Sequence, residues 1–425
     1  MDTHPTPASL RDRRKAGKSG LVGVVDVGSS KVCCVIAKPE TDGSLRVVGY
    51  GHQASFGIRA GAVANMDAAE SAIGAAVQSA EAMAGETLRS VTVNLSGGQP
   101  SSATIAVQVS TGGLPIGDPA LRKIALQCKT ALSELDGVPL HIIPTGYSLD
   151  GSRGIKDPRG MIGSQLDVQL HAITVNQAAL RNLVTCIERT HLEIDRVVLS
   201  PLAAGRACLL PDEAELGVTL IDMGGGTTTI GVFSEGDMVF ADAIPMGGIH
   251  VTNDIARGLI TPTAYAERIK TLYGHAMTTT TDRHEQIDVP QLGEHEQAVV
   301  TQMPRSLLIG IIQPRIEEIL EMVRARLEHS GFGKTGGRRV VLTGGASQMP
   351  GTRELAQQIL EKQVRIGRPP QVPGLPETLT SPEFSVVMGL LFYATQPNTE
   401  YRVINSSDSA RGLLGRIGEW FRENV

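Results

Sequence analysis

The pattern of apolar and polar positions singles out one stretch, Gly217–Phe233. An apolar segment there ends in Asp222, three glycines follow, and a second apolar segment runs from Ile230 to Phe233. This order predicts a β-hairpin whose turn has almost no side chains. Glycines in a turn let backbone N–H groups come close to an oxyanion such as a phosphate. Asp222, at the end of the strand, is placed to hold a metal ion or its water shell.

The chain repeats this pattern nearer its N-terminus, in Val24–Ala37. Aligning Asp26 with Asp222 also aligns Gly28 with Gly224. A single Gly-rich hairpin is weak evidence, whereas a repeat indicates two homologous halves. Two such hairpins would face each other across a cleft and clasp the phosphates of a nucleotide with Mg²⁺ between them. The pattern is similar to that of the actin-like ATPase superfamily, which includes actin, heat-shock chaperones, sugar kinases and bacterial filament proteins.

The spacing of apolar residues predicts the other elements of the first half. A helix is expected over Ala68–Met83, because small and apolar residues recur there on one face. The first hairpin is expected from Leu21 to about Pro39, further strands at Leu45–Gly49 and Val91–Leu95, and amphipathic helices at Ala178–Thr190 and Val197–Leu210.

The span 96–171 departs from the order of elements in actin. Its pattern predicts a helix near Pro119–Leu135 and strands at Ala103–Ser110, His141–Ser148 and Gln165–Val175. An insertion of this size does not occur at this place in actin, the chaperones or the sugar kinases. We therefore expect a small inserted α+β subdomain.

The second half continues after its hairpin with a strand at Met238–Ile244 and a helical run from about Val251. The polar segment Met277–Gln297 matches no zinc-site spacing, which favours a mobile loop over a metal site. A long helix is expected over Leu307–Leu327, interrupted by Pro314. The strand Arg338–Leu342, a helix at Thr352–Glu361 and an apolar helix at Phe384–Ala394 complete this half.

Together these elements predict an α/β, two-lobed actin-like fold of duplicated ribonuclease-H-like halves, with an inserted α+β subdomain and a C-terminal amphipathic helix. The expected units are a polar, basic and disordered tail (1–20), the first lobe core (21–95, 172–215 and 380–397), the inserted subdomain (96–171), the second lobe core (216–250 and 332–379), its outer subdomain (251–331), a linker (398–409) and the terminal helix (410–425).

Composition narrows the class of protein. The 425 residues exceed a single core and suit two lobes. A net charge of −5 argues against general nucleic-acid binding, which needs a basic face. The five cysteines are odd in number and lack CxxC spacing, so we expect free thiols in a reducing cytosol. The N-terminus lacks the apolar core of a signal peptide.

The C-terminal segment has the pattern of a helix that lies in a membrane surface. Its polar face carries arginine and glutamate, and the single Trp of the chain is on the apolar face. A terminal helix docked on the protein body is the alternative, and the polar tether before it favours the membrane. The residues expected to enter lipid are Leu413, Leu414, Ile417, Trp420 and Phe421.

Longer strings resemble one family, the bacterial cell-division protein FtsA. They include HIIPTGYSLDGSRGIKDPRGM (141–161), VLTGGASQMPG (341–351) and QVRIGRP (363–369), in addition to the hairpins and the terminal helix. The resemblance implies an ATP-binding protein that polymerises on the cytoplasmic face of the plasma membrane at midcell. It also implies that the chain anchors FtsZ filaments through their C-terminal peptide and contacts later division proteins. Arg305 and Arg315 are the candidates for the acidic peptide.

The hairpins and the resemblance together assign roles to the candidate site. Asp26 and Asp222 would hold the shell of Mg²⁺. Glu267 and Lys270 lie three apart on one helical face, and an ion pair at the surface or a pair that binds the ribose of ATP remain equal alternatives. The residues expected to bind the nucleotide are Gly28, Ser29, Ser30, Lys31, Gly224, Gly225, Gly226, Thr227, Glu267, Lys270, Gly344, Gly345 and Ala346.

One departure bears on catalysis. Filament relatives such as MreB carry a Glu, and actin a Gln, in the helix before the second hairpin, where it orients the attacking water. Ser200 stands in that place and is neither a base nor long enough to act alone. We therefore expect at most a weak ATPase in which ATP is mainly a structural and switching ligand. The alternatives are a soluble small-molecule kinase of the same fold and a pilus-assembly relative such as PilM.

Overall fold

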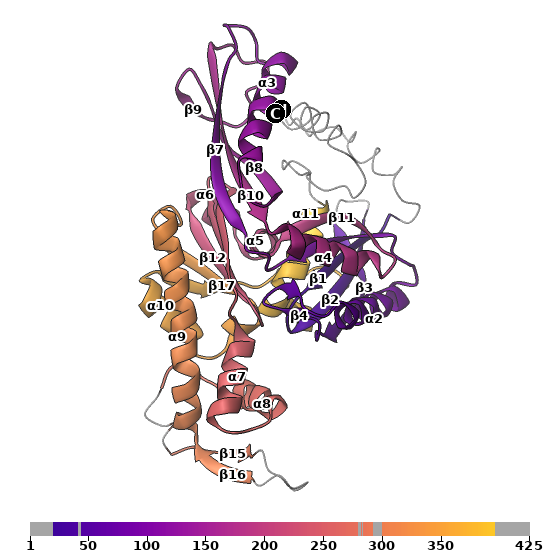
Figure 1. Cartoon of the computed structure of the whole chain (residues 1–425), viewed down its shortest axis with the longest axis vertical. Coiled ribbons are helices and arrows are strands. Elements are labelled where there is room, and N and C mark those ends of the chain that lie inside the picture. The colour runs from indigo at the N-terminus through magenta and orange to yellow at the C-terminus, as the bar shows by residue number, and fades with distance from the viewer. Residues whose placement is uncertain (1–19, 41–43, 279–281, 283, 292–299, 396–425) are drawn as a thin grey trace.

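The computed structural model describes residues 20–40, 44–278, 282, 284–291 and 300–395. Figure 1 shows an elongated molecule: the sheet that packs against helix α3 lies at one end, the sheets that contain β1 and β12 lie in the middle, and helices α7 and α8 with the β15–β16 hairpin lie at the other end. Residues 1–19 of the predicted basic tail, the linker and the membrane residues Leu413, Leu414, Ile417, Trp420 and Phe421 fall outside the described residues. Within the described ranges, no helix combines the length and apolarity needed to cross a membrane.

The first half is built on a sheet of order β11-β6-β1-β2-β3. The β1–β2 and β2–β3 pairs are antiparallel, and β1–β6 and β6–β11 are parallel. Helix α2 packs close to β3 because Gly49 and Gly51 face the helix backbone; a Cβ atom on either would lie 2.2 Å from a carbonyl oxygen of α2. The elements are β1 (Val22–Val27), β2 (Lys31–Pro39), β3 (Leu45–Ala54), β4 (Ile58–Arg59), β5 (Ala62–Val63), α2 (Met66–Ala84), β6 (Ser90–Leu95), α4 (Gln177–Glu188), β11 (Glu193–Leu199) and α5 (Ser200–Cys208).

The second half repeats this topology in a sheet of order β14-β13-β12-β17-β18. Its first three strands are again antiparallel neighbours, and β12–β17 and β17–β18 are parallel. Helix α11 is apolar along its length and packs on α5, so closely that a Cβ atom on Gly389 would lie 1.7 Å from the carbonyl oxygen of Ala203. The elements are α6 (Pro211–Leu216), β12 (Val218–Met223), β13 (Thr228–Ser234), β14 (Asp237–Ile244), β17 (Arg339–Thr343), α10 (Thr352–Leu360), β18 (Gln363–Ile366) and α11 (Ser385–Thr395).

The inserted part forms a sheet of order β7-β10-β8-β9 with α3 packed against it. It contacts both halves through buried histidines: the Leu199 N–H donates to Nε2 of His141 at 2.9 Å, and Nδ1 of His171 lies 2.7 Å from the Met238 carbonyl oxygen. Ser102 also bonds to the backbone N–H and C=O of Ala241. The elements are β7 (Ser101–Ser110), α3 (Asp118–Ser133), β8 (Val138–Leu149), β9 (Ser152–Ile155) and β10 (Gln165–Val175).

The outer part of the second half consists of α7 (Gly248–Gly258), α8 (Thr263–Tyr273), the hairpin β15 (Gln286–Pro290) and β16 (Val300–Pro304), and α9 (Arg305–Ser330). These elements share one apolar core with the sheet of the second half. Helix α9 joins the two regions, because buried residues recur along it from Leu308 to Leu327.

Several sequence predictions about single elements were wrong. The predicted helix Val197–Leu210 is a strand, β11, followed by α5, because Val197–Leu199 pair in parallel with β6. The helical run from Val251 is two helices, since Pro262 removes a backbone donor between them. The expected loop Met277–Gln297 contains strand β15. Helix α9 runs through Pro314 without interruption, because its buried face continues on both sides of the proline.

Candidate functional site

The two predicted hairpins have the same backbone register. Asp26 pairs with Cys33 across β1–β2, and Asp222 pairs with Thr229 across β12–β13. Each turn is closed by the same hydrogen bond: the Gly28 N–H donates to the Lys31 carbonyl at 3.0 Å, and the Gly224 N–H donates to the Thr227 carbonyl at 2.9 Å. The sequence alignment of the two stretches therefore corresponds to a structural duplication.

The two turns meet directly. A Cβ atom on Gly225 would lie 2.9 Å from Cβ of Ser30, and one on Gly226 would lie 2.4 Å from Oγ of Ser29. Glycine is required at both positions because any side chain would overlap the opposite turn. Ser29 is buried, and its hydroxyl accepts a hydrogen bond from the Gly61 N–H at 3.1 Å. The turn of the first half and the turn of the second half are therefore in direct contact.

Two buried carboxyl groups end the first strand of each hairpin. Burial raises the pKa of Asp26 to about 6, an effect opposed by the positive charge of Lys31 and a hydrogen bond from Asn94. Burial, together with the charge of Asp26, raises the pKa of Asp222 to about 7. The two carboxylates thus repel each other in a region of low polarity, which a cation between them would relieve.

This arrangement fits Mg²⁺ in one specific way. Among the described residues, no group of three or more His, Cys, Asp or Glu side chains could hold a metal ion by itself. Mg²⁺ keeps several water molecules and is usually bound through one or two carboxylates together with substrate phosphates. Asp26 and Asp222, two buried carboxyl groups whose charges interact, supply that number of carboxylates.

Lys31 lies under the first turn in a mixed environment. Its Nζ atom is 3.5 Å from a carboxylate oxygen of Glu383 and 3.3 Å from the centre of the Phe384 ring. Burial lowers the pKa of Lys31, and the charges of Glu383 and Asp26 oppose that shift. Sequence reasoning missed Glu383, because no local pattern links this residue to a turn some 350 positions earlier.

The loop after β17 closes the site on the side of the second half. Gly344 has φ of +85°, and a Cβ atom there would lie 2.3 Å from Oδ1 of Asp222. Gly345 faces the side chain of Glu383, with 3.6 Å between the Cβ positions. The predicted Gly344–Ala346 segment therefore lies against Asp222 of the second hairpin and against Glu383, which in turn pairs with Lys31 of the first hairpin.

Helix α8 places Glu267 and Lys270 next to Gly248, close to the loop after β17. Nζ of Lys270 lies 2.7 Å from Oε2 of Glu267 and donates to Oγ1 of Thr252 at 2.8 Å and to the Gly248 carbonyl at 3.2 Å. A Cβ atom on Gly248 would in turn lie 3.4 Å from Cβ of Ala346. The ion pair is therefore formed, and it lies beside Gly344–Ala346, which are predicted to bind the nucleotide. Sequence reasoning missed Thr252, which the helical spacing of α7 gave no reason to select.

Arg305 and Arg315 lie elsewhere, on α9 in the outer part. Arg305 pairs with Asp282 at 3.3 Å and with Glu285 at 2.8 Å. Arg315 pairs with Asp254 at 2.5 Å and with Glu318. Each guanidinium group thus already has two acidic partners within the chain.

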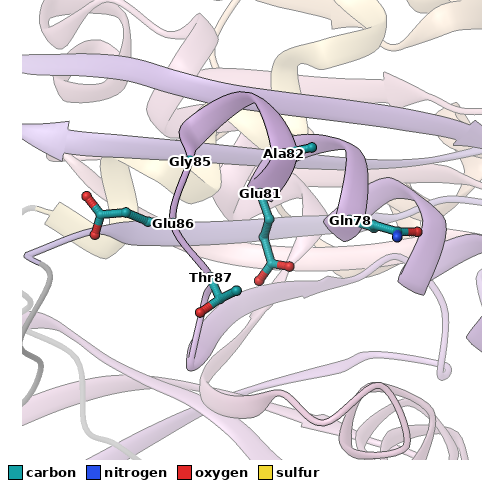
Figure 2. Close-up of a pocket in the computed structure, with 6 residues that line it drawn as sticks. All are labelled: Gln78, Glu81, Ala82, Gly85, Glu86 and Thr87. Carbon is teal, nitrogen blue, oxygen red and sulfur yellow. The ribbon is translucent and has the colours of Figure 1, made fainter.

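A separate open pocket of about 700 Å³ lies at the C-terminal end of α2 (Figure 2). In the picture Glu81 and Thr87 lie close together, and Glu86 points away from them. Oε1 of Glu81 accepts the Leu88 N–H at 2.6 Å, which fixes the chain after the helix. The lining is Gln78, Glu81, Ala82, Gly85, Glu86 and Thr87, and it contains no predicted site residue.

Comparisons with known sequences point to one family. The sequence model for cell division protein FtsA matches residues 219–389, and that for the SHS2 domain inserted in FTSA matches residues 97–174. The cell division protein FtsA of Agrobacterium fabrum is 42% identical over 422 residues, covering 96% of this chain and 95% of that protein.

Comparisons with solved structures agree on the fold. The PilM-PilN type IV pilus biogenesis complex matches with a TM-score of 0.64 and 17% identity, over 88% of this chain and 99% of that one. MreB 5 of Spiroplasma citri bound to AMPPNP matches with a TM-score of 0.53 and 14% identity, over 89% and 96%. At these identities the likeness concerns the fold alone. The predicted actin-like fold with an inserted subdomain is confirmed.

Proposed function

Because the chain belongs to the FtsA family of cell division proteins, we propose that it is an ATP-binding, actin-like division protein that forms filaments on the cytoplasmic face of the plasma membrane at midcell. There it anchors FtsZ filaments and recruits later division proteins. The observation that carries the nucleotide part is the pair of hairpins in identical register, each with a buried carboxylate, whose glycine turns meet.

Each group of site residues has a role in this proposal. Asp26 and Asp222 hold the Mg²⁺ shell, and the ion neutralises phosphate charge when it is bound. The backbone N–H groups of Gly28–Lys31 and Gly224–Thr227 cradle the phosphates. Glu267 and Lys270 take the ribose, and Gly344–Ala346 lie against adenine. The convergence of these four segments on one another supports the assignment.

We propose that hydrolysis is slow. Ser200 is the first residue of α5, is fully buried, and its hydroxyl accepts a hydrogen bond from Nδ2 of Asn94 at 3.1 Å. A serine hydroxyl held in this way is a poor base at neutral pH. ATP therefore serves mainly to order the two halves, and filament formation follows its binding.

The membrane role rests on the amphipathic pattern of residues 410–425. Trp420 and Phe421, with Leu413, Leu414 and Ile417, enter the lipid while the basic residues stay at the headgroups. One such helix binds weakly, so filament formation strengthens attachment by linking many helices.

The partner role is assigned to the outer part of the second half. Arg305 and Arg315 attract the acidic C-terminal peptide of FtsZ, whose carboxylates exchange with the acidic partners of the two arginines. The exposed side chains Tyr273 and Leu307 support this site, because Nε of Arg305 donates to the Tyr273 carbonyl at 2.8 Å and Leu307 follows on α9. Arg305, beside the exposed side chains of Tyr273 and Leu307, suits a short peptide with acidic and apolar residues.

Pelleting with anionic vesicles tests the proposal. The full chain should pellet, and should do so more strongly with ATP. A chain ending at Asn405 and the Trp420→Glu variant should stay in the supernatant while binding ATP as before. Vesicle binding that persists in both variants would refute the terminal helix as the anchor. Pelleting that ignores ATP would refute the coupling to nucleotide.

A further inference from the structure

The two hairpins are held to their neighbouring parallel strands in different ways. In the second half, the ladder between β12 and β17 continues to the pair Asp222 and Thr343. In the first half, the ladder between β1 and β6 stops one position earlier, at the pair Val25 and Val93. In the duplication, Asn94 of the first half is the equivalent of Thr343 of the second half. Asn94 is therefore the residue at which the first ladder ends.

Asn94 replaces the missing backbone pair with its side chain. Its Oδ1 atom accepts the Val27 N–H at 2.6 Å, and Val27 directly precedes the Gly28 turn. The same carboxamide hydrogen-bonds to the Asp26 carboxyl group. Asn94 is 1% exposed, so these bonds are made away from water, where leaving a donor unpaired is costly.

The other end of the carboxamide reaches the central helices. Nδ2 of Asn94 donates to Oγ of Ser200, the first residue of α5. The second half has a related contact, since the hydroxyl groups of Thr343 and Ser385 lie 2.6 Å apart and Ser385 is the first residue of α11. The Thr343 hydroxyl also lies 3.2 Å from the carbonyl oxygens of Gly367 and Pro382, and the backbone ladder holds the second turn instead.

We infer that Asn94 is a positioning residue for the nucleotide site, which fixes the Val27–Lys31 turn relative to helix α5. The inference rests on the proposed function in that the turn it positions is the proposed phosphate cradle. Because α5 packs on β12 and β13 of the second half as well as on β11, one buried side chain sets the first turn relative to both halves. The second turn needs no such side chain.

Amide hydrogen exchange on the ligand-free full chain tests the positioning role without nucleotide. Asn94→Thr copies the residue of the second half into the first. It should speed exchange across residues 27–31 about tenfold and leave residues 223–227 unchanged. Thr343→Val is the matched control: it should affect the start of α11 and leave residues 27–31 unchanged. Equal exchange at residues 27–31 in wild type and Asn94→Thr, or equal acceleration of both turns, would overturn the inference.

Equilibrium binding of ATP with Mg²⁺ is the second readout. Asn94→Thr should weaken binding about tenfold, whereas Ser102→Ala, which removes a half-buried hydroxyl at the contact of the insert with β14, should not. Changed exchange with unchanged ATP affinity would also overturn the role. If Asn94→Thr fails to fold, Asn94→Ser replaces it in both assays. If the wild type binds no ATP, the proposed function fails, while the exchange result still decides whether Asn94 holds the turn.

Discussion

The β1–β2 and β12–β13 hairpins follow the same backbone path and differ in the side chains of their turns. Both have an aspartate at the end of the first strand and the same turn hydrogen bond. The first turn adds a cation, Lys31, and a side-chain bond from Asn94, and its aspartate has the lower pKa of the two, about 6. The second turn is three glycines, and its aspartate has a pKa of about 7. The two turns thus follow the same chain path, and of the two only the first carries a cation, Lys31.

A side chain added to the Gly224–Gly226 turn should have the largest effect on ATP affinity. A Cβ atom on Gly226 would lie 2.4 Å from Oγ of Ser29, so Gly226→Val forces the two turns apart. We expect ATP affinity to fall at least a hundredfold, measured by calorimetry. Gly74→Ala, at a position on α2 with open space around it, is the control and should bind normally. Normal binding by Gly226→Val would separate the turns from the nucleotide site.

Neutralising the second aspartate should stabilise the ligand-free protein. Folding raises the pKa of Asp222 from 3.8 to about 7, so its ionisation costs stability. Below about pH 4 Asp222 is protonated in both the folded and the unfolded state, so its ionisation does not destabilise the fold. The destabilisation grows as pH rises and reaches its full size above about pH 7. Asp222→Asn should therefore gain about 2–4 kcal/mol at pH 8 in urea unfolding and almost nothing near pH 4. A gain that does not depend on pH would contradict this origin.

Replacing Lys31 with the residue at the equivalent position of the second turn, Thr227, removes the positive charge from the first turn. Lys31 and Thr227 occupy equivalent turn positions, and Lys31→Thr should weaken ATP binding about tenfold, because a charge beside the phosphates is lost. Lys31→Arg retains the charge and should recover part of the affinity. Equal loss in both variants would indicate that the contact of Lys31 with Phe384 matters more than its charge.

The smallest expected effect decides between the two alternatives for the helical ion pair. If Glu267 and Lys270 bind the ribose, Glu267→Gln should weaken ATP binding three- to tenfold and leave binding of inorganic triphosphate unchanged. Arg353 and Glu354 form an exposed ion pair on α10, and Glu354→Gln is a matched control. Unchanged ATP affinity in Glu267→Gln would leave the pair as a surface contact.

The sequence predicted the repeated parts of this molecule well. Asp26 and Asp222, with the glycines after them, identify both hairpins because turn chemistry is local. The helical face of α2 and the inserted subdomain were also predicted, since apolar periodicity marks them. Strand β11 was missed because its residues read equally well as the start of α5, and only pairing with β6 makes them a strand.

Side chains that act across long separations could not be predicted. Glu383, in the turn before α11, contacts Lys31, and Asn94, on β6, contacts Val27 and Ser200. Tertiary packing creates these contacts, and no local spacing in the sequence indicates them. Thr252 accepts a hydrogen bond from Lys270 only because helices α7 and α8 pack against each other. The sequence pattern identifies each helix or strand separately. These contacts depend on how the helices and strands pack in three dimensions, which the pattern does not give.

We propose that Asp26 and Asp222 hold one Mg²⁺–ATP complex between them. A double-mutant cycle on ATP affinity, with Asp26→Asn, Asp222→Asn and both together, each measured with Mg²⁺ and with EDTA, tests it most directly. If the two aspartates share one site, either single change should remove the Mg²⁺-dependent part of binding, and the second change should add little. Additive losses, or an affinity that does not depend on Mg²⁺ in the wild type, would contradict a shared site.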